Sequence, residues 1–151
     1  MSILNSSIVP VGSTGGYSID NSLRFNDDDS AYLSRTPSSA GNRKTWTWSG
    51  WVKRGNLGVS IIFGAGDSAG VSPYQSSIGF HSTDRFEFTL FGGFGYMKTT
   101  AIYRDLSAWY HIVVAVDTAQ ATPADRQSIY INGSKITAFD TETYYDQDNE
   151  S

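Results

Sequence analysis

Apolar and polar side chains alternate along most of the chain with a period of two residues, which is the period of a β-strand. In the stretch KTWTWSGWVKRG, residues 44–55, this period puts Trp46, Trp48 and Val52 on one face and Trp51 on the other. No window of 11 residues carries a helical stripe, because glycines and β-branched residues interrupt each attempt. The pattern predicts an all-β chain.

The stretch WYHIVVAVD, residues 109–117, is the most apolar of the expected strands. One face carries Tyr110, Ile112, Val114 and Val116. The other face, with His111, Val113 and Ala115, is also largely apolar, so we expect a central strand covered on both sides. Asn132-Gly133 follows the next strand, 128–131, and predicts a type I′ hairpin turn.

Further short strands are expected between polar or glycine-rich turns, at residues 22–25, 31–34, 59–63, 77–81, 85–90 and 96–103. Regularly spaced short strands predict an antiparallel β-sandwich at residues 21–140. Residues 1–20 are expected to form an extended arm, with a floppy terminus as the alternative. Residues 141–151 are expected to be an acidic polar tail or the truncated remainder of the domain.

Composition narrows the class of protein. The 151 residues suffice for one domain, and the 17% of charged residues is too low for a disordered chain. The absence of cysteine excludes disulfides, thiolate nucleophiles and cysteine-based zinc sites. A net charge of −4 predicts no nucleic-acid or membrane-surface partner, and we expect neither a signal peptide nor a membrane span.

Three motifs in this order resemble a known family: Ser49 to Arg54 (SGWVKR), Ala108 to Val114 (AWYHIVV) and Ile129 to Gly133 (IYING). From about Ser22 to Phe139 the chain resembles the concanavalin A-like lectin/glucanase superfamily. Within it, the chain is most similar to laminin-G-like modules of phage virion proteins, especially tail proteins of marine phages.

The resemblance implies a jelly-roll β-sandwich in a phage tail or fibre, made in the host cytoplasm. It implies other virion chains as partners, a homo-oligomer, and a possible ligand in bacterial surface polysaccharide. Two features depart from the family pattern. Gly50 stands where a large apolar residue is common, and the chain stops soon after the hairpin. The sandwich is therefore expected to lack its closing strands, either because the sequence is a fragment or because a neighbouring chain supplies the missing edge.

Catalysis is not expected. Glucanases of this fold carry a carboxylate triplet similar to Glu-x-Asp-x-(x)-Glu, since their two working carboxyls must lie about 5–5.5 Å apart. Here Glu87 stands alone on its strand, and Asp140-Thr141-Glu142 lies in the expected tail. The two histidines, His81 and His111, belong to no recognisable catalytic motif, and we expect His111 to be a sandwich residue.

Two kinds of binding site remain as hypotheses, and no cofactor is required. Calcium needs several hard oxygen ligands, for which the candidates are Asp27, Asp28, Asp29 and Asp67; an ordinary solvated turn is the favoured alternative. A glycan would stack on exposed aromatic rings, for which the candidates are Trp51, Tyr74, Phe94 and Tyr96. The alternative is that these rings fill the core, where Trp46, Trp48 and Trp109 are expected.

The sequence thus leaves three functions open. The first is a structural interaction module that joins neighbouring subunits by strand addition. The second is a lectin-like adhesin with or without calcium, and the third, a glucanase acting through Glu87, is remote.

Overall fold

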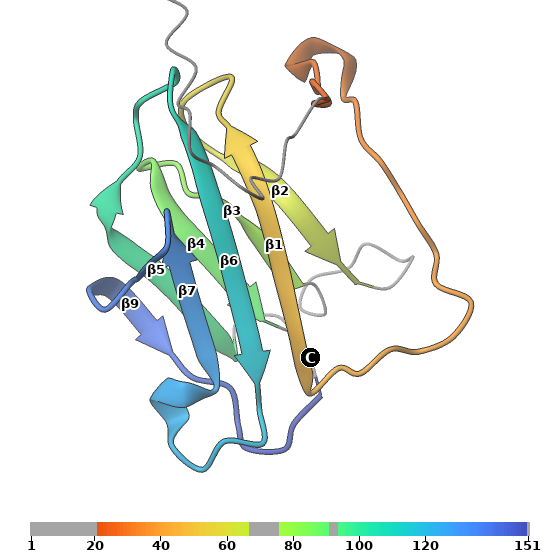
Figure 1. Cartoon of the computed structure of the whole chain (residues 1–151), viewed down its shortest axis with the longest axis vertical. Helices are drawn as coiled ribbons and strands as arrows, with labels where there is room; N and C mark the ends of the chain where they lie inside the picture. The colour runs from red at the N-terminus through yellow and green to blue at the C-terminus, as the bar shows by residue number, and fades with distance from the viewer. Residues whose placement is uncertain (1–20, 67–75, 91–93, 151) are drawn as a thin grey trace, which may run out of the picture. The chain divides into compact units, whose positions relative to one another are not determined.

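The computed structural model describes residues 21–66, 76–90 and 94–150 (Figure 1). The chain divides into two compact units, Met1–Ser38 and Ser39–Ser151. The arm expected at residues 1–20 lies outside the described residues. Among the described residues, no helix is long and apolar enough to cross a membrane.

In the first unit, residues 21–38 contain one short 3₁₀ helix, η1 (Asp27–Asp29), and no strand. The strands expected at 22–25 and 31–34 are therefore wrong. Their apolar side chains are exposed, namely Leu23, Phe25, Tyr32 and Leu33. Alternation supplies one apolar face, but a strand also needs a hydrogen-bonded neighbour, and these residues have no ladder partner among the described ones.

The second unit consists of two antiparallel sheets, as the alternation predicts (Figure 1). The four-stranded sheet has the order β1 (Thr45–Lys53), β6 (Trp109–Asp117), β7 (Gln127–Ile131) and β8 (Ser134–Lys135). The five-stranded sheet has the order β2 (Ser60–Ala65), β3 (Ser76–Phe80), β4 (Arg85–Leu90), β5 (Gly95–Ile102) and β9 (Phe139–Thr143). A 3₁₀ helix, η2 (Pro123–Asp125), precedes β7.

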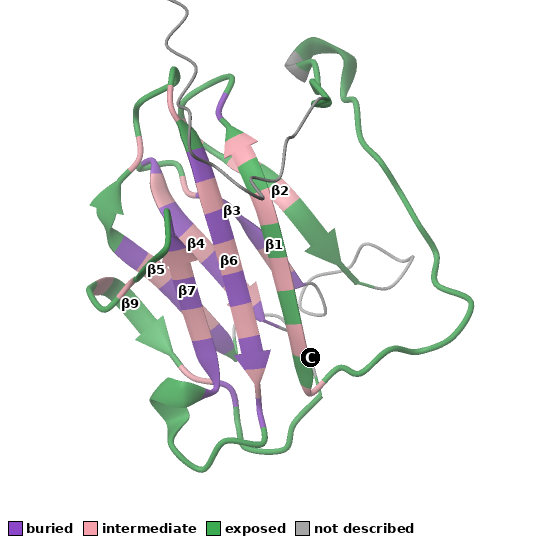
Figure 2. Cartoon of the chain, in the orientation of Figure 1, coloured by how far each residue is buried: buried purple, intermediate pink, exposed green. Residues whose placement is uncertain are grey.

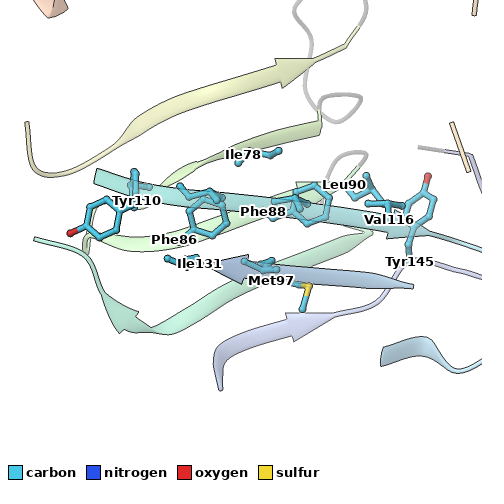
Figure 3. Packing of buried hydrophobic residues seen from close by; sticks show 13 residues of the cluster. Ile78, Phe86, Phe88, Leu90, Met97, Tyr110, Val116, Ile131 and Tyr145 are labelled. Carbon is cyan, nitrogen blue, oxygen red and sulfur yellow. The ribbon is translucent and has the colours of Figure 1, made fainter. Parts of the chain in front are cut away.

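The core lies between the two sheets (Figure 3). It consists of side chains at every second position of the strands, including Ile78, Phe86, Phe88, Leu90, Met97, Tyr110, Ile112, Val114, Val116, Ile129 and Ile131. Aromatic contacts join the sheets: the Trp46 ring meets Phe88 edge-on at 6.0 Å, and the Phe80 ring lies 6.4 Å from Tyr110. Burial of this apolar row is the main stabilising term of the fold.

Strand β6 is central, between β1 and β7, as its apolar pattern predicts. Its second face is not covered, however: His111, Val113 and Ala115 are only half-buried (Figure 2). The expectation of two covered faces is therefore wrong, and this row lies on the outer face of the four-stranded sheet. The hairpin prediction is confirmed, because Asn132 and Gly133 have φ angles of 52° and 79°.

The tryptophans divide between the core and the surface. Trp46 and Trp48 pack against the core as expected, whereas Trp109 is 48% exposed, so its expected core position is wrong. Trp109 has the same strand parity as His111, which places its ring on the outer face. Gly50 leaves room for the Trp48 ring, because a Cβ atom there would lie 2.9 Å from Trp48 Cη2.

The C-terminal segment takes part in the fold, in contrast to the acidic polar tail that is one of the two expectations for residues 141–151. Residues 139–143 form β9, which pairs with β5, and the following Tyr145 is only 1% exposed. The Tyr145 hydroxyl donates to the Glu150 carbonyl at 2.7 Å, and its backbone N–H donates to Gln127 Oε1 at 2.7 Å. Arg126 adds a bond from Nη1 to the Tyr145 carbonyl at 3.0 Å. One buried aromatic ring thus ties this segment to the core.

Candidate functional site

Exposed aromatic rings gather on the outer face of the four-stranded sheet, where β1 ends and β6 begins. Trp51 lies directly opposite His111, with ring centroids 5.0 Å apart and planes inclined by 32°. Trp109 lies on the same face, two residues before His111 and opposite Lys53. Trp51 is 54% exposed. We call Trp51, His111 and Trp109 the aromatic platform.

Strand periodicity explains why these rings face outward. Even-numbered residues of β1 and β6 point to the core, and odd-numbered residues point away from it (Figure 2). The antiparallel register then sets Trp51 beside His111. Sequence reasoning predicted the outward face of Trp51, and the register adds its neighbour.

Polar groups adjoin the platform and hold His111 in place. Ser49 Oγ and His111 Nε2 share a hydrogen bond of 3.2 Å. The backbone N–H of His111 donates to Asn132 Oδ1 at 2.9 Å, and the N–H of Asn132 donates to the His111 carbonyl at 2.8 Å. The hairpin thereby fixes the backbone of His111, and Ser49 fixes its ring against Trp51.

This arrangement is suited to a ligand with both apolar and hydroxylated faces. An exposed indole offers a broad apolar surface, while hydroxyl, imidazole and amide groups beside it donate and accept hydrogen bonds. Lys53 and the half-buried Tyr130 are further polar groups on this face. Sugars combine apolar C–H faces with equatorial hydroxyls, so a glycan matches the platform.

Tyr96 occupies the outer face of the other sheet, so it does not join Trp51 in one site. Its hydroxyl donates to Glu87 Oε2 at 2.8 Å. Burial, followed by the hydrogen bond and charge of Glu87, raises the pKa of the Tyr96 hydroxyl, so this group stays protonated. Phe94 is 64% exposed, in the turn before β5. Tyr74 lies outside the described residues.

The carboxylates on the five-stranded sheet are engaged with basic and phenolic groups. Asp140 pairs with Lys98 at 2.8 Å and with Arg85 at 4.0 Å, and the hydrogen bond from Lys98 is the largest cause of its lowered pKa. Glu87 accepts the Tyr96 hydroxyl described above. His81 lies in the turn between β3 and β4, with its Nδ1 bonded to the Thr83 hydroxyl at 2.9 Å. The contacts of Asp140 and Glu87 are cross-strand pairs, and the contact of His81 lies within a turn.

The expected calcium ligands are only partly described. Asp29 lies in η1, where its Oδ2 accepts a 2.7 Å hydrogen bond from the Asn26 side-chain amide. Within the described part of the chain, no three His, Asp or Glu side chains are grouped as a metal site. Asp67 lies outside it, and the side chain of Asp27 is not described. Calcium binding stays a prediction.

The structure contains a cluster of one carboxylate and two guanidinium groups that the sequence analysis did not predict. Asp84, 5% exposed, pairs with Arg54 at 3.0 Å and with Arg104 at 2.9 Å. The backbone N–H of Gly58 donates to Asp84 Oδ1 at 2.7 Å and is the main cause that lowers the pKa of this carboxyl to about 2, with the two guanidinium groups adding to it. The Arg54 guanidinium also lies 4.3 Å from the centre of the Phe80 ring. The cluster joins three loops, namely those between β1 and β2, between β3 and β4, and between β5 and β6, and no local pattern links its members in the sequence.

Comparison with protein families gives one match. The model described as the concanavalin A-like lectin/glucanases superfamily, of the laminin-G type, matches residues 25–151. Comparisons with curated proteins and with solved structures give no match. This match supports, at the level of the superfamily, the resemblance that the sequence motifs indicate. The matched residues include strand β9 and Tyr145.

Proposed function

Because the chain belongs to the concanavalin A-like lectin/glucanase superfamily, we propose that it is a carbohydrate-binding module that holds a glycan on the aromatic platform. The observation that carries this proposal is the exposure of Trp51. Its ring is 54% exposed on the outer face of the four-stranded sheet and stacks beside His111. Large exposed aromatic residues in a group are a feature of binding surfaces.

Each platform residue has a definite part in the proposed binding. Trp51 stacks on the apolar face of a sugar ring, and Trp109 extends the apolar surface along the start of β6. His111 and Ser49 exchange hydrogen bonds with sugar hydroxyls, since each has both donor and acceptor capacity. A tryptophan at the centre of an interface commonly contributes about 2 kcal/mol or more, so loss of Trp51 should weaken binding about 30-fold.

A glycan array tests the proposal. The folded chain is applied with calcium and again with EDTA, beside Trp51→Ala and Phe94→Ala. We expect glycan retention by the parent chain and by Phe94→Ala, whose residue lies in the turn before β5 of the other sheet, and loss of retention by Trp51→Ala. Retention unchanged in Trp51→Ala overturns the assignment. Retention removed by EDTA would support the calcium-dependent adhesin.

We further propose the setting that the sequence resemblance implies: a virion module of a phage tail or fibre that binds bacterial surface polysaccharide without cleaving it. The motifs SGWVKR, AWYHIVV and IYING support the setting, and the missing carboxylate triplet supports the lack of cleavage. Labelled protein should bind bacterial cells, and extracted surface polysaccharide should compete with the cells. Release of reducing sugar that Glu87→Gln abolishes would instead establish the glucanase.

A further inference from the structure

Most lysine and arginine side chains of the unit 39–151 are paired with a partner of the same chain. Salt bridges to carboxylates involve Arg43, Lys44, Arg54, Arg85, Lys98 and Arg104. Arg126 donates instead to three backbone carbonyls. Lys53 and Lys135 are the exceptions, since neither forms a salt bridge within the described part of this unit. Carboxylates are not scarce, because the chain has 15 Asp and Glu residues against 11 Lys and Arg residues.

Both unpaired lysines lie on the outer face of the four-stranded sheet, which is also the face of the aromatic platform. Lys53 is the last residue of β1 and lies directly opposite Trp109. Lys135 of β8 lies opposite Tyr130 of β7, which in turn lies opposite an outward-pointing residue of β6. Residues that are directly opposite each other in adjacent strands share a face of the sheet. Both lysine side chains are exposed, so their ammonium groups are available to a ligand on this face.

The strand register places the two lysines on opposite sides of the platform. Lys53 follows Trp51 by two residues on one strand face, so their Cα atoms are about 6.8 Å apart. The flexible four-carbon stem of lysine spans a similar distance, which brings its ammonium group to a sugar stacked on Trp51. Lys135 is two strands away from β6, and its Cα atom lies about 12 Å from that of His111. A ligand that extends beyond His111 can therefore meet the second ammonium group.

Two carboxylates near this face, Asp117 and Asp105, do not take up the lysine charges. Asp117 is the last residue of β6, about 20 Å along the strand from His111. Asp105 accepts hydrogen bonds from the backbone N–H and the hydroxyl of Ser107 at 2.8 and 2.6 Å. The bond from this hydroxyl is the largest cause that lowers the pKa of Asp105, and the charge of Lys53 is the last. Asp105 is thus held by Ser107 rather than by Lys53, whose ammonium group stays open to a carboxylate of a ligand.

We propose that the aromatic platform selects acidic glycans, whose sugars carry carboxylate or sulfate groups, through Lys53 and Lys135. This inference rests on the proposed function, because it names the class of glycan that the same platform holds. Trp51 stacks on the apolar face of a sugar whether or not the sugar is charged, so the two lysines determine the specificity. Their charge also attracts an anionic polymer to one face of a chain whose net charge of −4 would otherwise repel it.

A glycan array that pairs acidic polymers with their neutral counterparts tests the proposal. The pairs are polygalacturonate and hyaluronan with their carboxyl-reduced forms, and dextran sulfate with dextran. We expect the parent chain to retain an acidic polymer at least about fivefold more strongly than its neutral counterpart, and to lose this preference at about 1 M salt, where charges are screened within about 3 Å. Lys53→Gln should reduce the preference, Lys53→Arg should keep it, and the double variant Lys53→Gln/Lys135→Gln should abolish it. Lys44→Gln removes the same charge from a lysine that is paired with Asp148, so this matched control should keep the preference.

The outcomes separate this inference from the proposed function, with circular dichroism showing that each variant is folded. Retention that depends on Trp51 but is equal for acidic and neutral polymers overturns the selection by charge and leaves the proposed function standing. A preference for acidic polymers that persists in the double lysine variant, or that Lys44→Gln abolishes as well, overturns the role of Lys53 and Lys135. Retention that Trp51→Ala leaves unchanged, or no retention of any glycan by the parent chain, overturns both the inference and the proposed function.

Discussion

Replacement of Tyr145 by alanine tests whether the C-terminal segment stabilises the fold. The Tyr145 side chain is 1% exposed and belongs to the core cluster, although it stands among polar residues near the end of the sequence (Figure 3). Its hydroxyl adds the hydrogen bond to the Glu150 carbonyl. Truncation to alanine therefore removes both a buried ring and a polar contact.

The magnitude follows from the buried area. An aromatic side chain buries about 150–250 Å², which at about 25 cal/mol per Å² corresponds to about 4–6 kcal/mol as an upper estimate. Substitutions of buried Phe or Trp by Ala cost about 3–5 kcal/mol. We therefore expect Tyr145→Ala to lower the free energy of unfolding by about 3–5 kcal/mol. Tyr145→Phe loses only the hydroxyl contact and should cost about 1 kcal/mol.

Urea unfolding followed by tryptophan fluorescence measures these differences, with thermal unfolding as a second measurement. A loss of 3–5 kcal/mol should lower the Tm by about 10 °C in a domain of this size. Tyr144→Ala is the matched control, because the neighbouring ring is only half-buried and should cost less. A Tyr145→Ala chain within about 0.5 kcal/mol of the parent would refute the reasoning and leave residues 144–150 outside the cooperative unit.

Two further predictions concern buried polar groups. Gly95→Ala would put a Cβ atom 2.8 Å from both terminal atoms of the buried Gln127 amide, so we expect a loss of about 1–3 kcal/mol in urea unfolding, whereas Gly55→Ala, with no atom within 4 Å of its Cβ, should be close to neutral. An equal response of the two glycines would contradict the packing at Gln127. Asp84 has its pKa lowered from 3.8 to about 2, so its ionised form stabilises the fold above pH 4, and this contribution falls as the pH drops through about 2. Tm measured against pH should therefore fall less steeply from pH 4 to 2 in Asp84→Asn than in the parent, and parallel curves would exclude this linkage.

The fold was largely predictable where side chains alternate over a long run. The limits of β4 and β6 match the sequence pattern, since each carries an apolar row that only one sheet face can bury. Residues 22–34 also alternate, yet a strand depends on a distant partner that local patterns do not reveal. The burial of Tyr145 was not predicted, because a single buried ring among polar residues produces no periodic pattern in the sequence.

The candidate site was predictable only in part. Strand parity places Trp51 outward, whereas its contact with His111 depends on the β1–β6 register, which joins residues 60 positions apart. The same parity would have placed Trp109 outward, but its size favoured the core. The Arg54–Asp84 pair joins the β1–β2 loop to the β3–β4 turn across 30 positions of sequence, and nothing in the local sequence marks it.

The central claim is that a glycan binds on Trp51, and the indole N–H signals of the four tryptophans test it most directly. A two-dimensional ¹⁵N–¹H spectrum resolves one such signal for each tryptophan, and Trp51→Phe assigns the relevant one. On titration with a glycan retained on the array, we predict that the Trp51 signal shifts most, that Trp109 follows, and that the core residues Trp46 and Trp48 change least. A bound glycan that leaves the Trp51 signal unmoved would contradict the claim.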